Sequence, residues 1–319
     1  MPCTSADKEM PSRANGLEHN TRVSELKHDK WAGTTYGNGW MHRWLVRFLA
    51  VIDVRLLYVF ASVFVVPPTL LVNASARHAI YRYFRSRWGY GPLRAAWMTV
   101  RNHCAFSQVV IDRFAMYAGK RFRMDIDGGG YFDSLAHSPG AFVQLSSHIG
   151  NYEIAGYSLV AKDKRFNALV FAGEKESVMA NRNRMFRDNN IRMIPMSADM
   201  SHLFLMDAAL ADGEIVSMPA DRIFGSQKYY EIDFLGAPAR FPQGAFLLAA
   251  VRHVPVLFVA VMKHAPTSYR IIVRPISATT EGNVKERARS LAEAYVEQLE
   301  TVVRQYPTQW YNYFDFWTQ

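Results

Sequence analysis

The stretch Leu145-Ser146-Ser147-His148-Ile149-Gly150-Asn151-Tyr152-Glu153 decides how the rest of the chain is arranged. The mostly apolar run before it, residues 141–145, has the length and composition of a buried strand. Gly150 and Asn151 are turn or cap residues, and the apolar residues after them predict a helix. His148 is therefore expected at the carboxyl end of a strand, which is the edge where open α/β sheets bind their ligands.

Glu153 follows His148 by five residues, a spacing that does not place two side chains on the same face of a regular helix. If His148 lies in the turn before the helix, its ring can fold back onto the Glu153 carboxylate. A carboxylate there fixes the imidazole tautomer and stabilises the charge that the ring acquires with a proton. The stretch therefore predicts His148 as a general base oriented by Glu153, with the N–H groups near Gly150 and Asn151 as an oxyanion site.

The remainder of the chain alternates between strand-like and helix-like segments. This alternation predicts an α/β fold with a central, mostly parallel or mixed sheet flanked by helices. Gly128–Gly130 is expected to be a turn. The expected strands are 122–126, 168–172, 191–195, 214–218, 229–234, 256–262 and 269–273, and the expected helices are 177–189, 200–210, 243–251 and 284–305.

The chain before this domain divides into two parts. Residues 1–38 are polar and are expected to be a poorly ordered tail, whereas residues 39–120 are expected to be helical; the α/β domain then occupies 121–319. Within the helical part, residues 44–72 are strongly apolar, but Asp53 and Arg55 interrupt the run and Pro67-Pro68 should break it. The uninterrupted stretch is therefore shorter than the roughly 20 residues of a transmembrane helix. Basic flanks favour a helix or helical hairpin in a membrane interface. A pair of buried core helices is the alternative.

Charge and composition limit the partners and cofactors. The formal net charge of +9 suits nucleic acid, an anionic membrane surface or an acidic protein. No nucleic-acid-binding module is present in the sequence, so nucleic acid is not expected as a partner. The histidines lack metal-ligand spacing, and we expect neither a metal nor a cofactor.

A second charged pair, Asp221-Arg222, follows the expected strand 214–218 and so has the same topological position as His148. A charged pair that emerges from an apolar strand belongs at the carboxyl edge of the sheet, where both side chains are candidates for substrate binding. A structural ion pair is the alternative interpretation.

These motifs together resemble the lysophospholipid acyltransferase superfamily. The similarity is closest to the branch that contains the lipid A late acyltransferases and the mycobacterial mannoside acyltransferases. It covers roughly residues 40–315. It rests on His-x4-Glu with Gly-Asn-Tyr inside, followed in order by Gly213-Glu214, Asp221, Phe234-Leu235-Gly236 and Gly244.

The resemblance implies a fold like that of glycerol-3-phosphate acyltransferase. It also implies transfer of a fatty acyl chain from an acyl thioester, of acyl carrier protein or CoA, to a hydroxyl or amine of a lipid or glycolipid. The expected location is the cytoplasmic face of a bacterial inner membrane.

Family members also place an arginine between the two motifs, and here Arg184 is the candidate for a substrate-binding residue beside Asn151. A solvated basic face is the alternative for this arginine. Two departures, Ile223 in place of a second acidic residue and Leu235 in place of phenylalanine, favour an acceptor other than lipid A itself.

Two other functions remain open at this stage. A serine hydrolase would use Ser146 or Ser147 with His148, but the Gly-x-Ser-x-Gly elbow is absent from the sequence. A non-catalytic membrane-binding protein would use the basic and aromatic N-terminal half alone.

Overall fold

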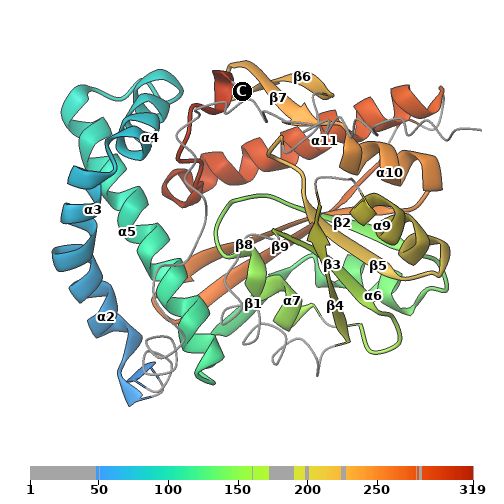
Figure 1. Cartoon of the computed structure of the whole chain (residues 1–319), viewed down its shortest axis with the longest axis horizontal. Helices are drawn as coiled ribbons and strands as arrows, with labels where there is room; N and C mark the ends of the chain where they lie inside the picture. Colours follow the sequence, from blue (N-terminus) through green and yellow to red (C-terminus); the bar gives the residue numbers. More distant parts are fainter. Residues whose placement is uncertain are drawn as a thin grey trace, which may run out of the picture. The chain divides into compact units, whose positions relative to one another are not determined.

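The central feature of the computed structural model is a seven-stranded sheet in the order β1-β9-β8-β2-β5-β3-β4 (Figure 1). The structure describes residues 48–49, 51–159, 161–171, 190–197, 201–223, 228–277, 279 and 282–318, so the expected tail 1–38 and helix 177–189 lie outside the described residues. The strands are β1 (Arg123–Asp127), β2 (Phe142–Ser146), β3 (Phe166–Phe171), β4 (Ile191–Met196), β5 (Ile215–Pro219), β8 (Val256–Ala265) and β9 (Ser268–Ile276).

All neighbouring strands of this sheet run parallel except β8 and β9, which form an antiparallel pair. The predicted α/β fold with a mostly parallel, mixed sheet is confirmed. Strand β2 lies between β8 and β5, and the loop after β2 therefore leaves the middle of the sheet at its carboxyl edge.

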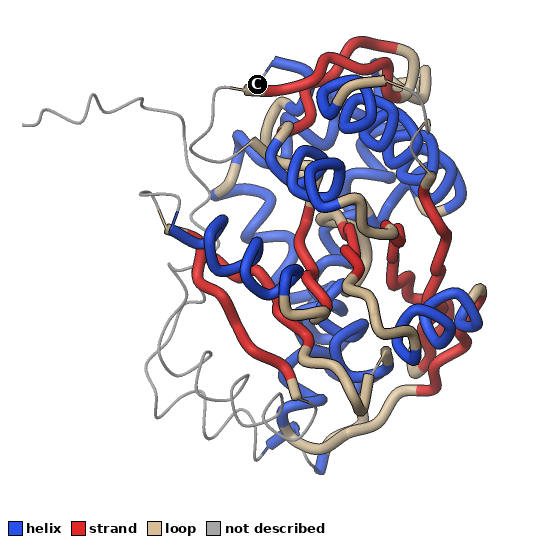
Figure 2. Tube along the Cα trace, turned by 90° about the vertical axis from the view of Figure 1, so that its right-hand side faces the viewer, coloured by secondary structure: helices blue, strands red, loops and turns tan. Residues whose placement is uncertain are grey.

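In the middle of the sheet both faces are buried, and alternate side chains of each strand point to opposite sides. On β8, Phe258 and Ala260 belong to one hydrophobic cluster, whereas Leu257 and Val259 belong to the other. In Figure 1, α10 and α11 lie above the strands and α6 and α7 below them, and Figure 2 shows the same strands flanked by helices after a quarter turn. The covering helices are α6 (Gly129–His137), α7 (Ala155–Ser158), α9 (Ser201–Ala211), α10 (Gly244–Arg252) and α11 (Val284–Gln305).

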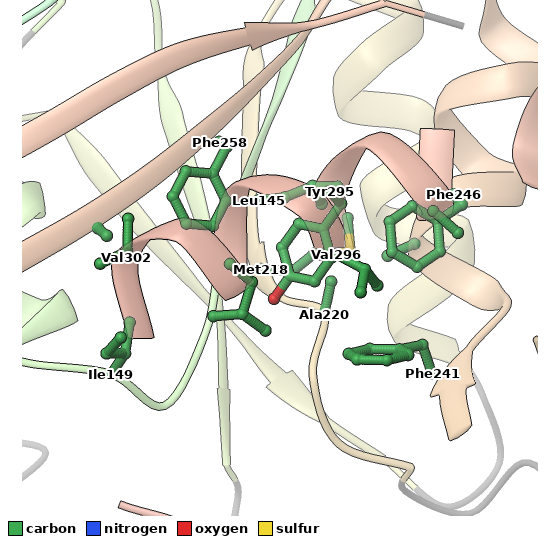
Figure 3. Packing of buried hydrophobic residues seen from close by; sticks show 14 of the residues in the cluster. Leu145, Ile149, Met218, Ala220, Phe241, Phe246, Phe258, Tyr295, Val296 and Val302 are labelled. Atoms are coloured by element: carbon green, nitrogen blue, oxygen red, sulfur yellow. The ribbon is translucent and has the colours of Figure 1, made fainter. Parts of the chain in front are cut away.

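Helix α11 contributes eight buried residues to the upper core, and its bounds are those that its apolar periodicity predicts. Its first turn is closed by a capping box, in which the Asn283 side chain accepts from the Glu286 N–H and the Glu286 carboxylate accepts from the Asn283 N–H. Figure 3 shows Tyr295 of this helix among the buried side chains, with its ring centroid 5.7 Å from that of Phe258.

Two local expectations differ from the structure, and a third is confirmed. Gly128–Gly130 is more than a turn, because α6 begins at Gly129 and buries Phe132 and Ala136, four residues apart on one face. The expected helix after Asn151 is only a short 3₁₀ turn, η2 (Tyr152–Ile154), followed by the four residues of α7. The expected strand 229–234 is β6 (Tyr229–Phe234), which pairs with β7 (Ala237–Pro242) in a separate two-stranded sheet.

The N-terminal apolar run forms one continuous helix from Val54 to Val72. It consists of α2 (Val54–Phe60), the π-helical turn η1 (Ala61–Val65) and α3 (Val66–Val72), and its 19 residues are enough, by length and composition alone, to cross a membrane. The expected break at Pro67-Pro68 is wrong. The prolines lie in the first turn of α3, and the π turn before them accommodates their missing N–H groups.

This helix has one packed face and one exposed face. Its packed face lies along α5 (Pro92–Tyr117) over all three segments, as Figure 1 shows, and the connection to α5 runs through α4 (Ala74–Ser86). The packed face includes Tyr58, whose hydroxyl donates to Asp112 of α5. The exposed face consists of large apolar residues that are each at least half exposed: Leu56, Val59, Phe60, Val63, Phe64, Leu71 and Val72.

A buried ion pair joins α5 to the sheet. Asp112, which is fully buried, binds the Lys263 ammonium of β8 and also accepts from the hydroxyls of Tyr58 and Tyr269. The Tyr58 hydroxyl and the Lys263 ammonium also lie within hydrogen-bonding distance of the Pro266 carbonyl. A buried charge is tolerated only when it is paired and hydrogen-bonded, so this network fixes the apolar helix, α5 and the sheet to one another.

Candidate active site

The site is built where two neighbouring strands end at the same level. In the parallel pair of β2 and β5, Ser146 is opposite Pro219, and the Ala220 N–H donates to the Ser146 carbonyl at 2.9 Å. His148 and Asp221 each follow the last residue of their strand by two positions. The registry of the two strands therefore brings these side chains together at the carboxyl edge of the sheet.

Asp221 holds His148 at two points. One carboxylate oxygen, Oδ1, is 2.8 Å from His148 Nδ1, and the other, Oδ2, accepts from the His148 backbone N–H at 3.0 Å. The Asp221 side chain is fully buried, whereas 23% of the His148 side chain is exposed. With Nδ1 protonated toward the carboxylate, the tautomer leaves a lone pair on Nε2, which no residue in the described part of the chain engages.

The carboxylate on His148 Nδ1 thus belongs to Asp221, and the prediction that Glu153 occupies this position is wrong. The carboxylate of Glu153 lies 3.3 Å from the Arg113 guanidinium and accepts from the Tyr117 hydroxyl at 3.1 Å, both on α5. The reason is local geometry. After Asn151 the chain turns through η2, whose Ile154 packs in the lower hydrophobic cluster and carries Glu153 toward α5.

The electrostatic surroundings keep the imidazole neutral. Burial and the nearby Arg222 guanidinium lower the pKa of His148, and the Asp221 carboxylate offsets this only in part, so the pKa lies below that of an ordinary histidine. Burial raises the pKa of Asp221, but His148 and Arg222 lower it by a larger amount. The net pKa is therefore below that of an ordinary aspartate, and the carboxyl stays ionised. A neutral imidazole beside an ionised carboxylate is the arrangement that a general base requires.

Arg222 is tied to the C-terminal segment. Its Nε donates to Asn312 Oδ1 at 2.9 Å, its Nη2 donates to the Tyr311 carbonyl at 2.8 Å, and its guanidinium lies 5.4 Å from the centre of the Phe314 ring. These contacts give Arg222 a structural role, while its charge acts on His148.

The same C-terminal segment fixes the backbone of the histidine loop. The Tyr311 N–H donates to the His148 carbonyl at 3.1 Å, and the Gly150 N–H donates to the Gln309 carbonyl at 2.8 Å. The Asn151 N–H donates to the Val261 carbonyl, also at 2.8 Å. The expectation that the Gly150 and Asn151 N–H groups form an oxyanion site is therefore wrong, because both are engaged by protein carbonyls.

The other candidates are placed differently. The Asn151 side chain is 1% exposed and points inward, with its Nδ2 3.5 Å from the Tyr269 hydroxyl, which in turn binds Asp112. Asn151 therefore connects the loop to the buried ion pair. Arg184 lies outside the described residues.

The C-terminal residues Gln309, Tyr311 and Asn312 were not predicted from the sequence to be part of the site. The signal was present in the aromatic density of residues 310–317, because a chain end with so many large rings is expected to pack into the fold. The ring of Trp310, 1% exposed, packs 5.5 Å from that of Phe234.

The fold and this pair define a site for base-catalysed chemistry at the carboxyl edge of an α/β sheet. The model of the bacterial lipid A biosynthesis acyltransferase family matches residues 118–317, more than half of the chain, and the protein belongs to this family. It is therefore an acyltransferase that acts on a lipid acceptor, as the resemblance of its motifs predicts.

One solved structure that the chain resembles is the crystal structure of the 1-acyl-sn-glycerophosphate (LPA) acyltransferase, PlsC, from Thermotoga maritima. The two are 13% identical, the match covers 72% of this chain and 95% of that one, and the TM-score is 0.34. No curated protein matches the chain.

Gly150 offers a direct test of how tightly the histidine loop is held. Its φ is +57°, and a Cβ there would overlap the Val261 carbonyl oxygen. We expect Gly150→Ala to lower the free energy of unfolding by at least about 2 kcal/mol, because the substitution adds left-handed strain to a backbone clash. Chemical denaturation in detergent measures this. Gly130→Ala, where a Cβ meets nothing within 4 Å, is the matched control. An equal effect of the two substitutions would contradict the close packing of Gly150 against the Val261 carbonyl.

Proposed function

We propose that the enzyme moves a fatty acyl chain from an acyl thioester, of acyl carrier protein or CoA, to a hydroxyl or amine of a lipid or glycolipid, with His148 as the general base. The observation that carries this proposal is the His148–Asp221 pair, in which Nδ1 is bound to an ionised carboxylate and Nε2 is left as the base.

In the proposed reaction, Nε2 of His148 removes the proton from the acceptor hydroxyl as its oxygen attacks the thioester carbonyl carbon. The C–S bond then breaks, and the imidazolium returns the proton to the thiolate, so that an ester and a free thiol are formed. Asp221 holds the tautomer and stabilises the imidazolium, as the carboxylate does in hydrolase triads. General-base catalysis of this kind contributes about 10²–10⁴-fold.

The proposal assigns new roles to two residues. Asp221 is a positioning residue for His148 rather than a substrate ligand, and Glu153 supports the loop through Arg113 and Tyr117 rather than orienting the base. Arg222 remains a candidate for substrate binding, because its Nη1 makes no hydrogen bond to the described residues while the rest of its guanidinium is held.

We further propose that the enzyme lies on the cytoplasmic face of a bacterial inner membrane, with helix 54–72 in the plane of the interface. The exposed apolar face of the helix supports contact with lipid. Its other face is packed along α5, which carries charged residues such as Arg101 and Asp112 and is poorly suited to the hydrocarbon core. Because helix 54–72 is packed along α5, it could span a bilayer only if α5 entered the bilayer as well.

The serine-hydrolase alternative is disfavoured by burial. Ser147 is fully buried and Ser146 is 6% exposed, so neither hydroxyl is presented to a substrate beside His148.

The lipids of cells that express the enzyme test the proposed reaction. Wild type is expected to produce a lipid heavier by one acyl chain, and His148→Ala is expected to lose this product because transfer falls by at least about 10²-fold. Mass spectrometry of the extracted lipids measures the product. Ser147→Ala is the control and should retain it, and loss in Ser147→Ala with retention in His148→Ala would exclude the proposed base.

The pH dependence of kcat/KM distinguishes Asp221 from Glu153. A general base works unprotonated, so activity is lost as the pH falls through the pKa of His148, which burial and Arg222 hold below that of an ordinary histidine. Asp221→Asn removes the charge that raises this pKa, and we expect the acidic limb to move to lower pH and the rate to fall about 10²–10⁴-fold. Glu153→Gln should leave the limb in place. A shift in Glu153→Gln without one in Asp221→Asn would reverse the two assignments.

Cysteine labelling tests the placement of the helix in the membrane. Arg55 and Arg77 are exposed and lie near its two ends; each is replaced by cysteine in a chain with Cys3→Ser and Cys104→Ser. In intact spheroplasts, a membrane-impermeant maleimide should label neither position until the cells are permeabilised. Phe204→Cys, at an exposed position of α9, is the control for the cytoplasmic side. Labelling of one end alone in intact cells would show that the helix spans the membrane.

A further inference from the structure

A cavity of about 420 Å³ lies where the start of α2, the end of α5 and the turn between β8 and β9 meet. Its polar lining consists of Asp53, Lys120, Arg121 and Thr267. The apolar part of the wall includes Phe122, which is 9% exposed. The cavity is outside the His148 site and takes no part in the proposed reaction.

Two cations line this cavity. Neither the Lys120 ammonium nor the Arg121 guanidinium is paired with a carboxylate in the described part of the chain. Exposed arginines elsewhere are often paired, as in Arg270 with Asp125 and Arg274 with Asp127. The one carboxylate in the lining, Asp53, accepts from the Arg55 N–H and caps α2. Two adjacent cations beside a hydroxyl form a lining that suits a phosphate group.

The apolar surroundings indicate what the phosphate is attached to. The exposed apolar face of helix 54–72 begins at Leu56, one turn beyond the Asp53 that lines the cavity. A molecule with its phosphate between Lys120 and Arg121 can therefore lay hydrocarbon along this face. A free phosphate or a soluble phosphate ester would gain nothing from that surface.

We propose that this cavity binds the phosphate of a membrane phospholipid headgroup. Lys120 and Arg121 bind the phosphate oxygens, Thr267 adds a hydroxyl donor, and the acyl chains follow the apolar face of helix 54–72. The site anchors the end of the helix nearest the sheet. Beside it, the Tyr58 hydroxyl and the Lys263 ammonium lie within hydrogen-bonding distance of the Pro266 carbonyl, so the bound headgroup lies next to the buried network that joins this helix to the sheet.

The test compares two kinds of vesicle, one of phosphatidylcholine and one of a galactolipid that has no phosphate. Both carry no net charge, which keeps non-specific attraction small. The full-length enzyme is expected to partition at least about tenfold more strongly into phosphatidylcholine, and Lys120→Ala/Arg121→Ala is expected to lose this preference. Arg289→Ala/Arg304→Ala, which removes two exposed cations from α11, is the matched control and should keep it.

Three results would overturn the proposal. The first is equal partitioning of the wild type into both vesicles, and the second is a preference that persists in Lys120→Ala/Arg121→Ala while its thermal midpoint is unchanged. The third is calorimetric binding of inorganic phosphate by the enzyme in detergent when the enzyme shows no preference between the two vesicles. This result would identify a soluble phosphate compound as the ligand. His148→Ala should partition like wild type, so the result stands apart from that of the acyl-transfer test.

Discussion

The bond between His148 Nδ1 and Asp221 is the interaction on which the proposed chemistry depends. It exists because β2 and β5 are parallel neighbours that end level with each other, so that residues 73 positions apart meet two steps beyond their strands. The buried carboxylate selects the tautomer. Its own pKa is lowered by His148 and Arg222, whereas burial and Arg222 lower the pKa of the histidine. The result is a base that is neutral and partly exposed at physiological pH.

The backbone of the loop that carries His148 is fixed by contacts with β8 and with the C-terminal segment. Gly150 passes so close to Val261 that no side chain fits, and residues 309–311 bind the loop through its own N–H and carbonyl groups. Asn151 then links the loop to the network of Tyr269, Asp112 and Lys263, which also contacts helix 54–72. His148 and the exposed apolar face of helix 54–72 are thus joined through one network of contacts. The acceptor of this enzyme is a lipid.

Periodicity and position were sufficient to predict much of the fold from the sequence. The bounds of α11 follow from its apolar spacing, and the carboxyl-edge positions of His148 and Asp221 follow from the strands that precede them. The partner of His148 was beyond this reasoning, because it depends on which strands are neighbours, a non-local property. Short spacing favoured Glu153, yet the 3₁₀ turn after Asn151 carries that residue to α5. Likewise, Pro67 and Pro68 were expected to end a helix that a π turn allows to continue.

The protonation of the two ring nitrogens of His148 can be measured by NMR. In enzyme labelled with ¹⁵N at its histidines, with His148→Gln used to assign the resonance, the account predicts a neutral ring at pH 7 with the proton on Nδ1 and Nε2 unprotonated. The same spectra should show Nε2 gaining a proton only below the pH at which an ordinary histidine titrates. A proton found on Nε2 of a neutral ring, or an imidazolium that persists at pH 7, would contradict the assignment of His148 as the base and of Asp221 as the group that orients it.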